Sequence, residues 1–224
     1  MIKVLDMEVE NRNFLTEGAR AFGIRLDEKG AEAFDLYLKE LLKWNQKINL
    51  TAIRTEKEIV IKHFLDSLSV YPHLPKPSSL LDIGSGAGFP GIPLKIADPS
   101  LEITLIDSVR KKVDFQRHII RMLGLKGVET IHGRIQDKKV LECLGGRFDI
   151  VISRAFSDLQ TLFILSFPFL KKGGILLTMK GQGDSEEIGL LSHVERIRYR
   201  FKKAVPLLLP FSSFKRTILL FEKE

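Results

Sequence analysis

The stretch that decides the fold class is residues 80–91, which read LLDIGSGAGFPG. An apolar run typical of a buried strand ends in Asp82 and Ile83. A turn with alternating glycines follows, and Pro90 suits the first turn of a helix. Glycines let a backbone approach a ligand closely because they have no Cβ. Asp107 ends the next apolar run, 25 residues after Asp82, where an acid can accept hydrogen bonds from both hydroxyls of a ribose. The stretch therefore predicts a turn that binds a nucleoside.

Two cofactors match the glycine spacing. Gly86-x-Gly88-x-x-Gly91 is the dinucleotide pattern, in which a helix N-terminus binds a pyrophosphate. Counted from Asp82, the same residues match the Asp-x-Gly-x-Gly-x-Gly pattern of S-adenosylmethionine sites. Asp82 favours the second cofactor, because a carboxylate repels a pyrophosphate but suits a ligand that carries an ammonium and a sulfonium. A tight turn with a purely structural role is the third interpretation.

Apolar runs of strand length alternate with helix-length segments around this turn. We predict strands at 79–83, 103–107, 128–131, 148–153 and 174–179, and helices at 92–97, 109–123 and 159–170. This alternation is typical of βαβ units and a parallel sheet. Two last runs, 204–209 and 216–221, have no helix between them and should pair as an antiparallel ribbon at the end of the sheet.

The N-terminal third has a different pattern. Apolar residues recur at three- and four-residue steps after Asp27, and again after Thr55, where Glu58 completes a capping box. Three prolines between residues 71 and 79 then indicate a linker. The predicted fold class is α/β. Residues 1–72 form a helical cap, and residues 73–224 form a Rossmann-like class I methyltransferase domain that ends in the antiparallel strand pair.

The composition is that of a globular protein, with 44 % apolar and 28 % charged residues among 224. A single cysteine, Cys143, excludes an internal disulfide. The first 13 residues are acidic and resemble no signal peptide. The longest apolar stretch, 161–170, is far shorter than the roughly 20 residues that a membrane helix needs. We therefore expect a cytoplasmic monomer with no membrane partner.

Positive charge is concentrated in the C-terminal two thirds. Residues 1–78 carry 12 basic and 12 acidic side chains, whereas residues 79–224 carry 23 and 16 and so hold the whole net charge of +7. Two basic clusters, at 110–126 and 196–216, suit a polyanion such as nucleic acid, although a solvated lysine-rich surface has the same composition. The candidate RNA contacts are Arg110, Lys111, Lys112, Arg134, Lys180, Arg198 and Arg200.

The end of the fourth predicted strand bears on which atom is methylated. Residues 153–156 read SRAF, whereas methyltransferases of exocyclic amines carry an Asn/Asp-Pro-Pro-aromatic turn there. Methylation of a cytosine carbon needs a cysteine nucleophile, and Cys143 lies away from this strand end. No cluster of His, Asp and Glu in the sequence has the spacing of metal ligands, so we expect no metal. Ribose 2′-O methylation stays open, with Lys180 and Glu222 as candidate parts, although Arg154 stands where its acid should be.

With these motifs the chain resembles the bacterial small-subunit ribosomal RNA N7-guanine methyltransferases, also called the glucose-inhibited division protein B family. The resemblance runs from about Phe34 to the C-terminus. The motifs outside the glycine turn make it specific. The shared elements are Trp44-Asn45 with Asn49-Leu50-Thr51, His63 with Asp66-Ser67-Leu68, Asp82–Pro93, Leu105–Ser108, Gly133-Arg134, Ser153–Phe156 and Leu170–Gly174.

The resemblance implies a substrate, a cofactor and site residues. It implies methylation of one guanosine in the 530 loop of 16S ribosomal RNA, as RNA or as small ribosomal subunit, with S-adenosylmethionine as donor. The family positions that contact the cofactor correspond to Gly84 and Phe89, and the pair beside the adenine corresponds to Ile135 and Gln136. Arg154 corresponds to an arginine at the pocket of cofactor and substrate. With the pattern residues, the expected cofactor set is Asp82, Gly84, Gly86, Gly88, Phe89, Asp107, Ile135, Gln136 and Arg154.

Some features leave alternatives. The family often has an acid where Gln136 stands; the amide oxygen of Gln136 can accept a hydrogen bond from an adenine amino group, and so can Asp137. His63 and Trp44 suit ordinary packing as well as ligand contacts. Guanine N7 carries a lone pair and no proton, so we assign no catalytic base. A cofactor-binding or RNA-binding module without catalysis remains the alternative from another functional class.

Overall fold

The computed structural model describes residues 8–75, 78–154, 158–181 and 198–224. Within them a seven-stranded sheet has the order β3-β2-β1-β4-β5-β7-β6. The first five strands are parallel, β7 is antiparallel to β5, and β6 is antiparallel to β7. The strands are β1 (Ser79–Ile83), β2 (Glu102–Asp107), β3 (Val128–His132), β4 (Phe148–Ser153), β5 (Leu170–Lys180), β6 (Tyr199–Leu208) and β7 (Lys215–Lys223).

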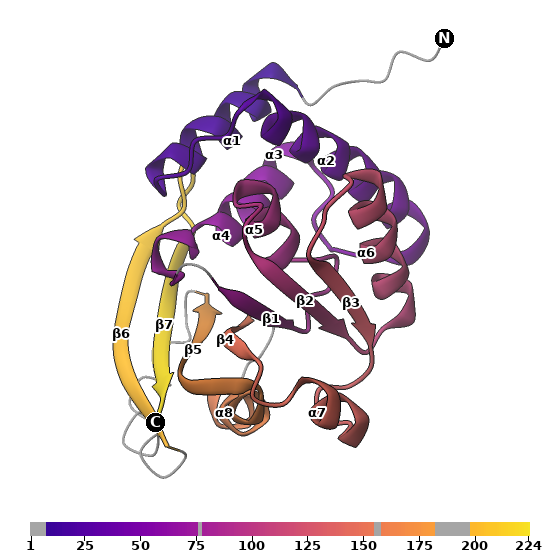
Figure 1. The fold of residues 1–224 in the computed structure, drawn as a ribbon. Helices are drawn as coiled ribbons and strands as arrows, with labels where there is room; N and C mark the ends of the chain where they lie inside the picture. Colours follow the sequence, from indigo (N-terminus) through magenta and orange to yellow (C-terminus); the bar gives the residue numbers. More distant parts are fainter. Residues whose placement is uncertain (1–7, 76–77, 155–157, 182–197) are drawn as a thin grey trace.

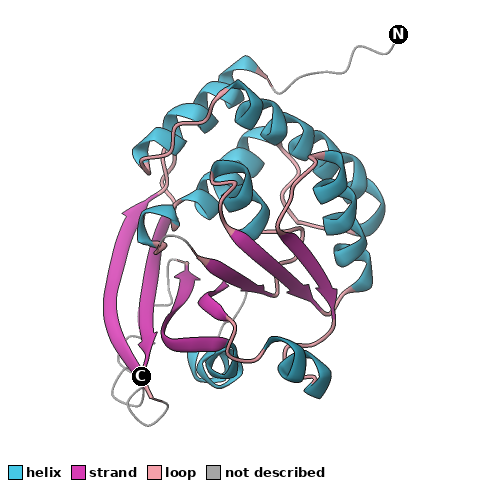
Figure 2. Ribbon diagram, viewed as in Figure 1, coloured by secondary structure: helices cyan, strands magenta, loops and turns pink. Residues whose placement is uncertain are grey.

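Helices cover both faces of the sheet (Figures 1 and 2). The first face carries α1 (Val9–Ala21), α2 (Glu28–Ile48), α5 (Gly91–Ala97) and α6 (Arg110–Met122). It also carries a helical run made of α3 (Glu56–Ile59), the π-helix η1 (Val60–Leu65), α4 (Asp66–Leu68) and the 3-10 turn η2 (Tyr71–His73). The second face carries α7 (Lys138–Leu144), α8 (Leu159–Ser166) and the 3-10 turn η3 (Phe167–Phe169). This three-layer arrangement confirms the predicted α/β class, including the antiparallel pair.

The two faces of each strand belong to two separate cores. Leu80 and Ile152 face the helices of the N-terminal third. Their neighbours in the sequence, Leu81 and Val151, face α7 and α8. This alternation follows from the period of two in a strand. The first core includes Leu15 of α1 and Ile218 of β7, so apolar residues of the predicted cap pack directly against the sheet. The boundary at residue 72 stays a prediction.

The ends of the cap helices follow their sequence signals. Asp27 caps α2, its carboxylate accepting the N–H of Gly30 at 2.8 Å. Thr55 caps α3, and its hydroxyl also donates to the Glu58 carboxylate at 2.9 Å. Several bounds differ from prediction. The strands expected at 174–179 and 204–209 begin at Leu170 and Tyr199. The helix expected at 159–170 ends at Ser166, because Pro168 cannot continue it, and α7 was not predicted.

Candidate active site

The glycine-rich turn lies between β1 and α5 at the carboxyl edge of the parallel strands (Figure 1). Gly84, Gly86 and Gly88 have φ values of 70°, 60° and 100°, which side chains other than glycine rarely adopt. At Gly88 a Cβ would also lie 2.4 Å from the Ile92 side chain. Glycine is therefore required both for the path of the turn and for its packing.

Side chains from two helices hold this turn in place. The hydroxyl of Tyr37, on α2, donates to the carbonyl of Ala87 at 2.6 Å. The amide of Gln116, on α6, donates to the carbonyl of Gly86 at 2.8 Å and to the Ser85 hydroxyl at 2.9 Å. Sequence reasoning missed both Tyr37 and Gln116. A glutamine on the apolar face of a predicted helix was the available signal, because buried polar groups are almost always hydrogen-bonded.

Asp82 lies beneath the turn and is completely buried. One carboxylate oxygen accepts the N–H of Gly91 at 2.9 Å, while Oδ1 has no partner among the described residues. Burial raises the pKa of Asp82 well above its usual range, opposed by the Gly91 N–H and by the charge of Arg154. Asp82 is thus buried beneath the turn and does not line the cavity beside it, and its contact with a cationic ligand stays a prediction.

A cavity of about 400 Å³ opens beside the turn, between the ends of β1, β2 and β3. Its volume lies within the usual range for small-ligand sites. Four predicted cofactor residues line it: Gly84, Asp107, Ile135 and Gln136. The other lining residues are Ile83, Ile106, Ser108, Gly133, Arg134, Thr161 and Leu165, of which only Arg134 was a predicted site residue, as an RNA contact.

Asp107 orders the cavity wall. Its Oδ2 accepts the N–H of Gly86 at 2.8 Å, and its Oδ1 accepts the N–H of Val109 at 2.8 Å, at the start of α6. Each carboxylate oxygen has a further lone pair, so Asp107 can position the turn and still accept hydrogen bonds from ribose hydroxyls. The residues of this cavity therefore fit a nucleoside.

The structure separates Gln136 from Asp137. Gln136 lines the cavity, whereas the carboxylate of Asp137 accepts the backbone N–H of Arg134 at 2.9 Å. Between the two candidates for the adenine contact, this placement favours Gln136, because the carboxylate of Asp137 orders the turn that follows β3.

The family-like motifs of the N-terminal third meet Arg154 on the other side of the turn. Asn45 exchanges two hydrogen bonds of 2.9 Å with the backbone of Thr51, whose hydroxyl lies 2.7 Å from Nε2 of His63. Nη2 of Arg154 donates to Nδ1 of His63 at 3.2 Å, and Nη1 donates to the carbonyl of Lys62 at 3.3 Å. Motifs that are far apart in the sequence thus form one network.

Asp66 completes the network. It is 2 % exposed, and its two oxygens face two guanidinium groups, Arg216 at 3.0 Å and Arg154 at 3.6 Å. Burial raises the pKa of Asp66, whereas both arginines lower it. Arg216 was expected only as one cation of the basic cluster at 196–216, but it is half-buried and anchors β7 to α4.

Phe89 forms the floor under Arg154. The guanidinium carbon lies 5.3 Å from the centre of the Phe89 ring, and the ring stacks on His63 at 4.6 Å. Phe89 is buried and is not part of the cavity wall, and neither are Asp82, Gly86, Gly88 and Arg154. The expected cofactor residues therefore divide into one group on the cavity and another on the Arg154 side of the turn.

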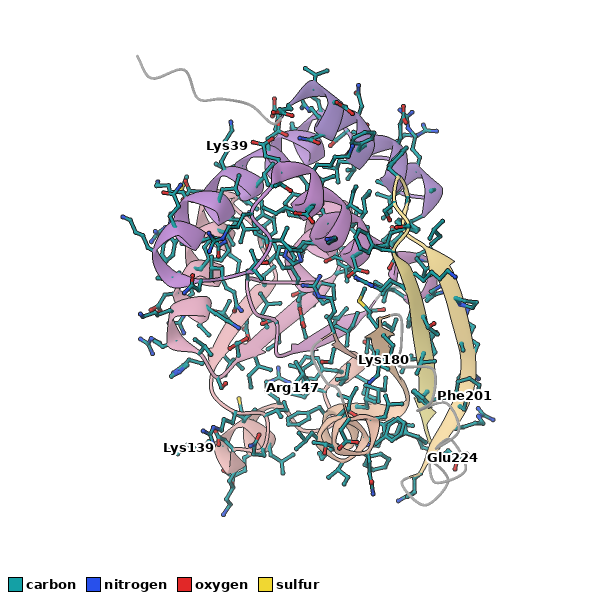
Figure 3. The ribbon with its side chains drawn as sticks, turned by 180° about the vertical axis from the view of Figure 1, so that it is seen from behind. Lys39, Lys139, Arg147, Lys180, Phe201 and Glu224 are labelled. Carbon is teal, nitrogen blue, oxygen red and sulfur yellow. The ribbon has the colours of Figure 1, made fainter. Side chains whose placement is uncertain are left out.

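The candidate RNA contacts do not form one surface. Arg110, Lys111 and Lys112 open α6 beside the cavity, which Arg134 lines. Lys180 is only 3 % exposed at the end of β5, labelled in Figure 3, so its prediction as a surface contact needs correction. Arg196 and part of the SRAF motif lie outside the described residues.

Arg198 and Arg200 lie at the opposite edge of the sheet. Arg200 on β6 is opposite Glu222 on β7, and Glu222 is opposite Ile175 on β5. The edge of the sheet near Arg154 corresponds to Lys180, at the other end of β5. Five residues of strand separate these levels by about 17 Å. Arg200 also bonds the carboxylate of Glu222 at 2.7 Å. The antiparallel turn thus divides the second basic cluster, and of its described residues only Lys215 and Arg216 lie at the end of the sheet near Arg154.

The described ranges contain neither a membrane-spanning helix nor a metal-binding group of side chains. None of the helices there is long and apolar enough to cross a bilayer. Across those same ranges, no three His, Cys, Asp or Glu side chains are grouped so that they could bind a metal ion.

The strand order, the glycine turn and the cavity define the class I S-adenosylmethionine-dependent methyltransferase fold. A solved example is the 1,6-didemethyltoxoflavin-N1-methyltransferase of Burkholderia thailandensis with bound S-adenosylhomocysteine. It superposes with a TM-score of 0.55 at 14 % identity, over 70 % of this chain and 76 % of the other. This likeness concerns the fold.

Sequence comparison gives the family. The model of the GidB family, described as rRNA small subunit methyltransferase G, matches residues 30–217. Proteins named ribosomal RNA small subunit methyltransferase G are similar throughout. That of Geobacter metallireducens is 41 % identical over 95 % of this chain and 96 % of its own length, and that of Acetivibrio thermocellus is 38 % identical over 97 % and 90 %. The chain belongs to the rRNA small subunit methyltransferase G family.

Proposed function

We propose that the chain transfers a methyl group from S-adenosylmethionine to N7 of a guanosine in the 530 loop of 16S ribosomal RNA. Membership of the family makes the chain an S-adenosylmethionine-dependent rRNA methyltransferase. The acceptor atom and the loop come from the sequence resemblance. The proposed partner is 16S RNA or the small ribosomal subunit. We propose that the protein acts as a monomer in the cytoplasm.

The observation that supports N7 chemistry is the network around Arg154. Both ring nitrogens of His63 are used, one by Arg154 and one by Thr51, and both oxygens of Asp66 face arginines. Burial and the charge of Arg154 lower the pKa of His63 to about 3. These groups are therefore not poised to take a proton. An acceptor with a free lone pair, such as guanine N7, needs no such group.

Each part of the site has a task in this proposal. Asp107 would hold the ribose hydroxyls, Ile135 and Gln136 would flank the adenine, and the backbone at Gly84 would approach the nucleoside closely. When bound, S-adenosylmethionine supplies an electrophilic methyl group on a sulfonium. The protein contributes alignment and exclusion of water, which are the main sources of rate for an attack that needs no base. Arg154 orients substrate groups but removes no proton.

The test is methylation with labelled S-adenosylmethionine, offered with deproteinised 16S RNA and with small ribosomal subunits. Digestion of the product should give 7-methylguanosine, and strand cleavage at the modified base should map it to the 530 loop. A ribose-methylated nucleoside would replace the proposed acceptor. Cofactor binding with no transfer to either substrate would favour a non-catalytic module. Sedimentation of the active protein checks the monomer.

A further inference from the structure

Two exposed phenylalanines project from the turn between β6 and β7. Phe211 is 45 % exposed and Phe214 is 37 % exposed. The backbone that carries them is ordered by its own hydrogen bonds. The N–H of Leu209 donates to the carbonyl of Phe214 at 3.0 Å, and the Ser212 hydroxyl donates to the carbonyl of Leu209 at 2.9 Å. The turn therefore presents both rings from a fixed backbone.

Phe211 adopts a costly conformation to hold this position. Its φ is 59°, in the left-handed region that bulky residues rarely enter. Its ring packs against the ring of Phe14 on α1, with the ring centres 4.9 Å apart, and still leaves 45 % of the residue exposed. Backbone strain at an exposed aromatic residue is typical of functional sites rather than of packing.

One cation lies over the Phe214 ring, and a second lies over Phe14, the ring that Phe211 contacts. Nζ of Lys62 lies 4.3 Å from the centre of the Phe214 ring, and Nζ of Lys57 lies 4.7 Å from that of Phe14. Lys57 and Lys215 are exposed, while Lys62 is paired with Glu58 at 2.6 Å. Aromatic rings among lysines are the pattern that binds single-stranded nucleic acid, with rings for the bases and ammonium groups for the phosphates.

Lys62 connects this turn to the active site. Its side chain reaches Phe214, and its backbone carbonyl accepts the hydrogen bond from Arg154 at 3.3 Å. The next residue along the strand from Lys215 is Arg216, which shares Asp66 with Arg154. Figure 1 shows the turn beside α1, at the end of the hairpin away from the C-terminus. The Phe214 ring thus stands about one lysine side chain from Arg154.

We infer that Phe211 and Phe214 form a stacking platform for unpaired bases of the RNA substrate, next to the base that is methylated. The inference rests on the proposed function for its ligand and adds a subsite to it. RNA is recognised mainly in loops, where unstacked bases can lie against aromatic side chains. The lysines around the rings favour this ligand over a neutral protein surface.

The test measures RNA affinity, which does not depend on turnover. Fluorescence anisotropy with a hairpin RNA that contains the 530 loop should show at least about fivefold weaker binding for Phe211→Ala/Phe214→Ala, the lower limit for loss of one stacked base. Binding of a duplex of equal length should change less than about twofold, because it has no unpaired base. Phe214→Tyr should bind like wild type, because the ring is kept.

Phe201→Ala is the matched control. Phe201 is 38 % exposed on the same hairpin but lies near the C-terminal Glu224, as Figure 3 shows, with Arg200 and Lys202 as neighbours. Its loss should leave hairpin binding unchanged. Melting temperature and cofactor affinity, measured on each variant, show that the fold is kept, and Phe214→Leu replaces any variant that fails this check.

Three results would overturn the inference. These are unchanged hairpin binding by the double variant, an equal loss on duplex RNA, or an equal loss for Phe201→Ala. A defect seen only on small ribosomal subunits and absent on deproteinised RNA would assign the platform to a ribosomal protein instead. If the methylated product is not 7-methylguanosine, the proposed function fails, while these affinities still decide whether the rings bind RNA.

Discussion

Arg154 donates a hydrogen bond to Nδ1 of His63 across 3.2 Å. A guanidinium cannot accept, so Nδ1 must carry the lone pair. The hydrogen of the neutral ring then lies on Nε2 and points to the Thr51 hydroxyl at 2.7 Å. Protonation of the ring would place a second hydrogen on Nδ1, pointing at the positively charged guanidinium of Arg154. His63 is therefore a neutral link between the helical cap and the end of β4.

This link predicts how stability depends on pH. The unfolded chain protonates His63 near 6.5, whereas burial and the Arg154 charge lower its folded pKa to about 3. Between these values the unfolded state binds one more proton, so the free energy of unfolding falls as the pH falls, by about 1.4 kcal/mol between pH 8 and pH 5.5. Urea unfolding of wild type and His63→Asn should show this difference in pH dependence. Parallel curves for the two proteins would contradict the neutral assignment.

Asp107 gives a prediction for cofactor affinity. Asp107→Ala removes the proposed ribose contact and the acceptor for the N–H groups of Gly86 and Val109. We expect S-adenosylmethionine to bind more weakly by about 1.5–3 kcal/mol, the range for hydrogen bonds to a charged group. Calorimetry measures it. Asp114→Ala is the control, because Asp114 is an exposed acid on α6 that does not line the cavity; this variant should bind within about twofold of wild type. Unchanged affinity in folded Asp107→Ala would refute the ribose role.

The division of the basic residues predicts a difference in salt dependence. Lys111 is exposed near the start of α6, beside the cavity, whereas Arg200 lies at the opposite edge and is paired with Glu222. Lys111→Gln should lower the slope of log affinity against log salt by about 0.7–0.9, as expected for one lost phosphate contact. Arg200→Gln should leave the slope unchanged. Filter binding over a salt series measures both, and a larger change for Arg200→Gln would reverse the assignment of the RNA face.

Most of the fold could be predicted because its signals are local. β1 and β4 have the bounds that their apolar runs predicted, and Asp27 marked the start of α2. The glycine turn was recognised because its positive φ values, from 60° to 100°, favour glycine, and the glycines are visible in the sequence itself. α7 was missed because this helix has only seven residues, KKVLECL, and most of them are exposed.

The site was less predictable because strand direction and burial are not local properties. Charge counts placed Arg200 and Arg216 in one cluster, but each lies near the start of its strand, and the starts of two antiparallel strands lie at opposite ends of the hairpin. Lys180 had the composition of a surface contact, and its place at the end of an inner strand buried it. The pairing of Asp66 with Arg216 joins residues 150 positions apart. No sequence spacing indicates such a contact.

The last prediction concerns the shape of Arg154. Its two terminal nitrogens donate in different directions, one to the Lys62 carbonyl and one to His63, while Asp66 balances the charge. Arg154→Lys keeps the charge next to Asp66 but cannot make both bonds, because an ammonium has no planar fork. The cationic group will then be misplaced by an ångström or so. Misplacement on that scale costs on the order of a hundredfold in rate.

We therefore expect Arg154→Lys to bind S-adenosylmethionine nearly as wild type and to slow single-turnover methylation by about a hundredfold, with little change in melting temperature. The three quantities should be measured on one preparation. A near-normal rate would mean that Arg154 acts as a point charge, for example on an RNA phosphate. Loss of melting temperature together with rate would assign it a structural role, since the buried carboxylate of Asp66 depends on its charge. Wild-type turnover in Arg154→Ala would remove the residue from the site.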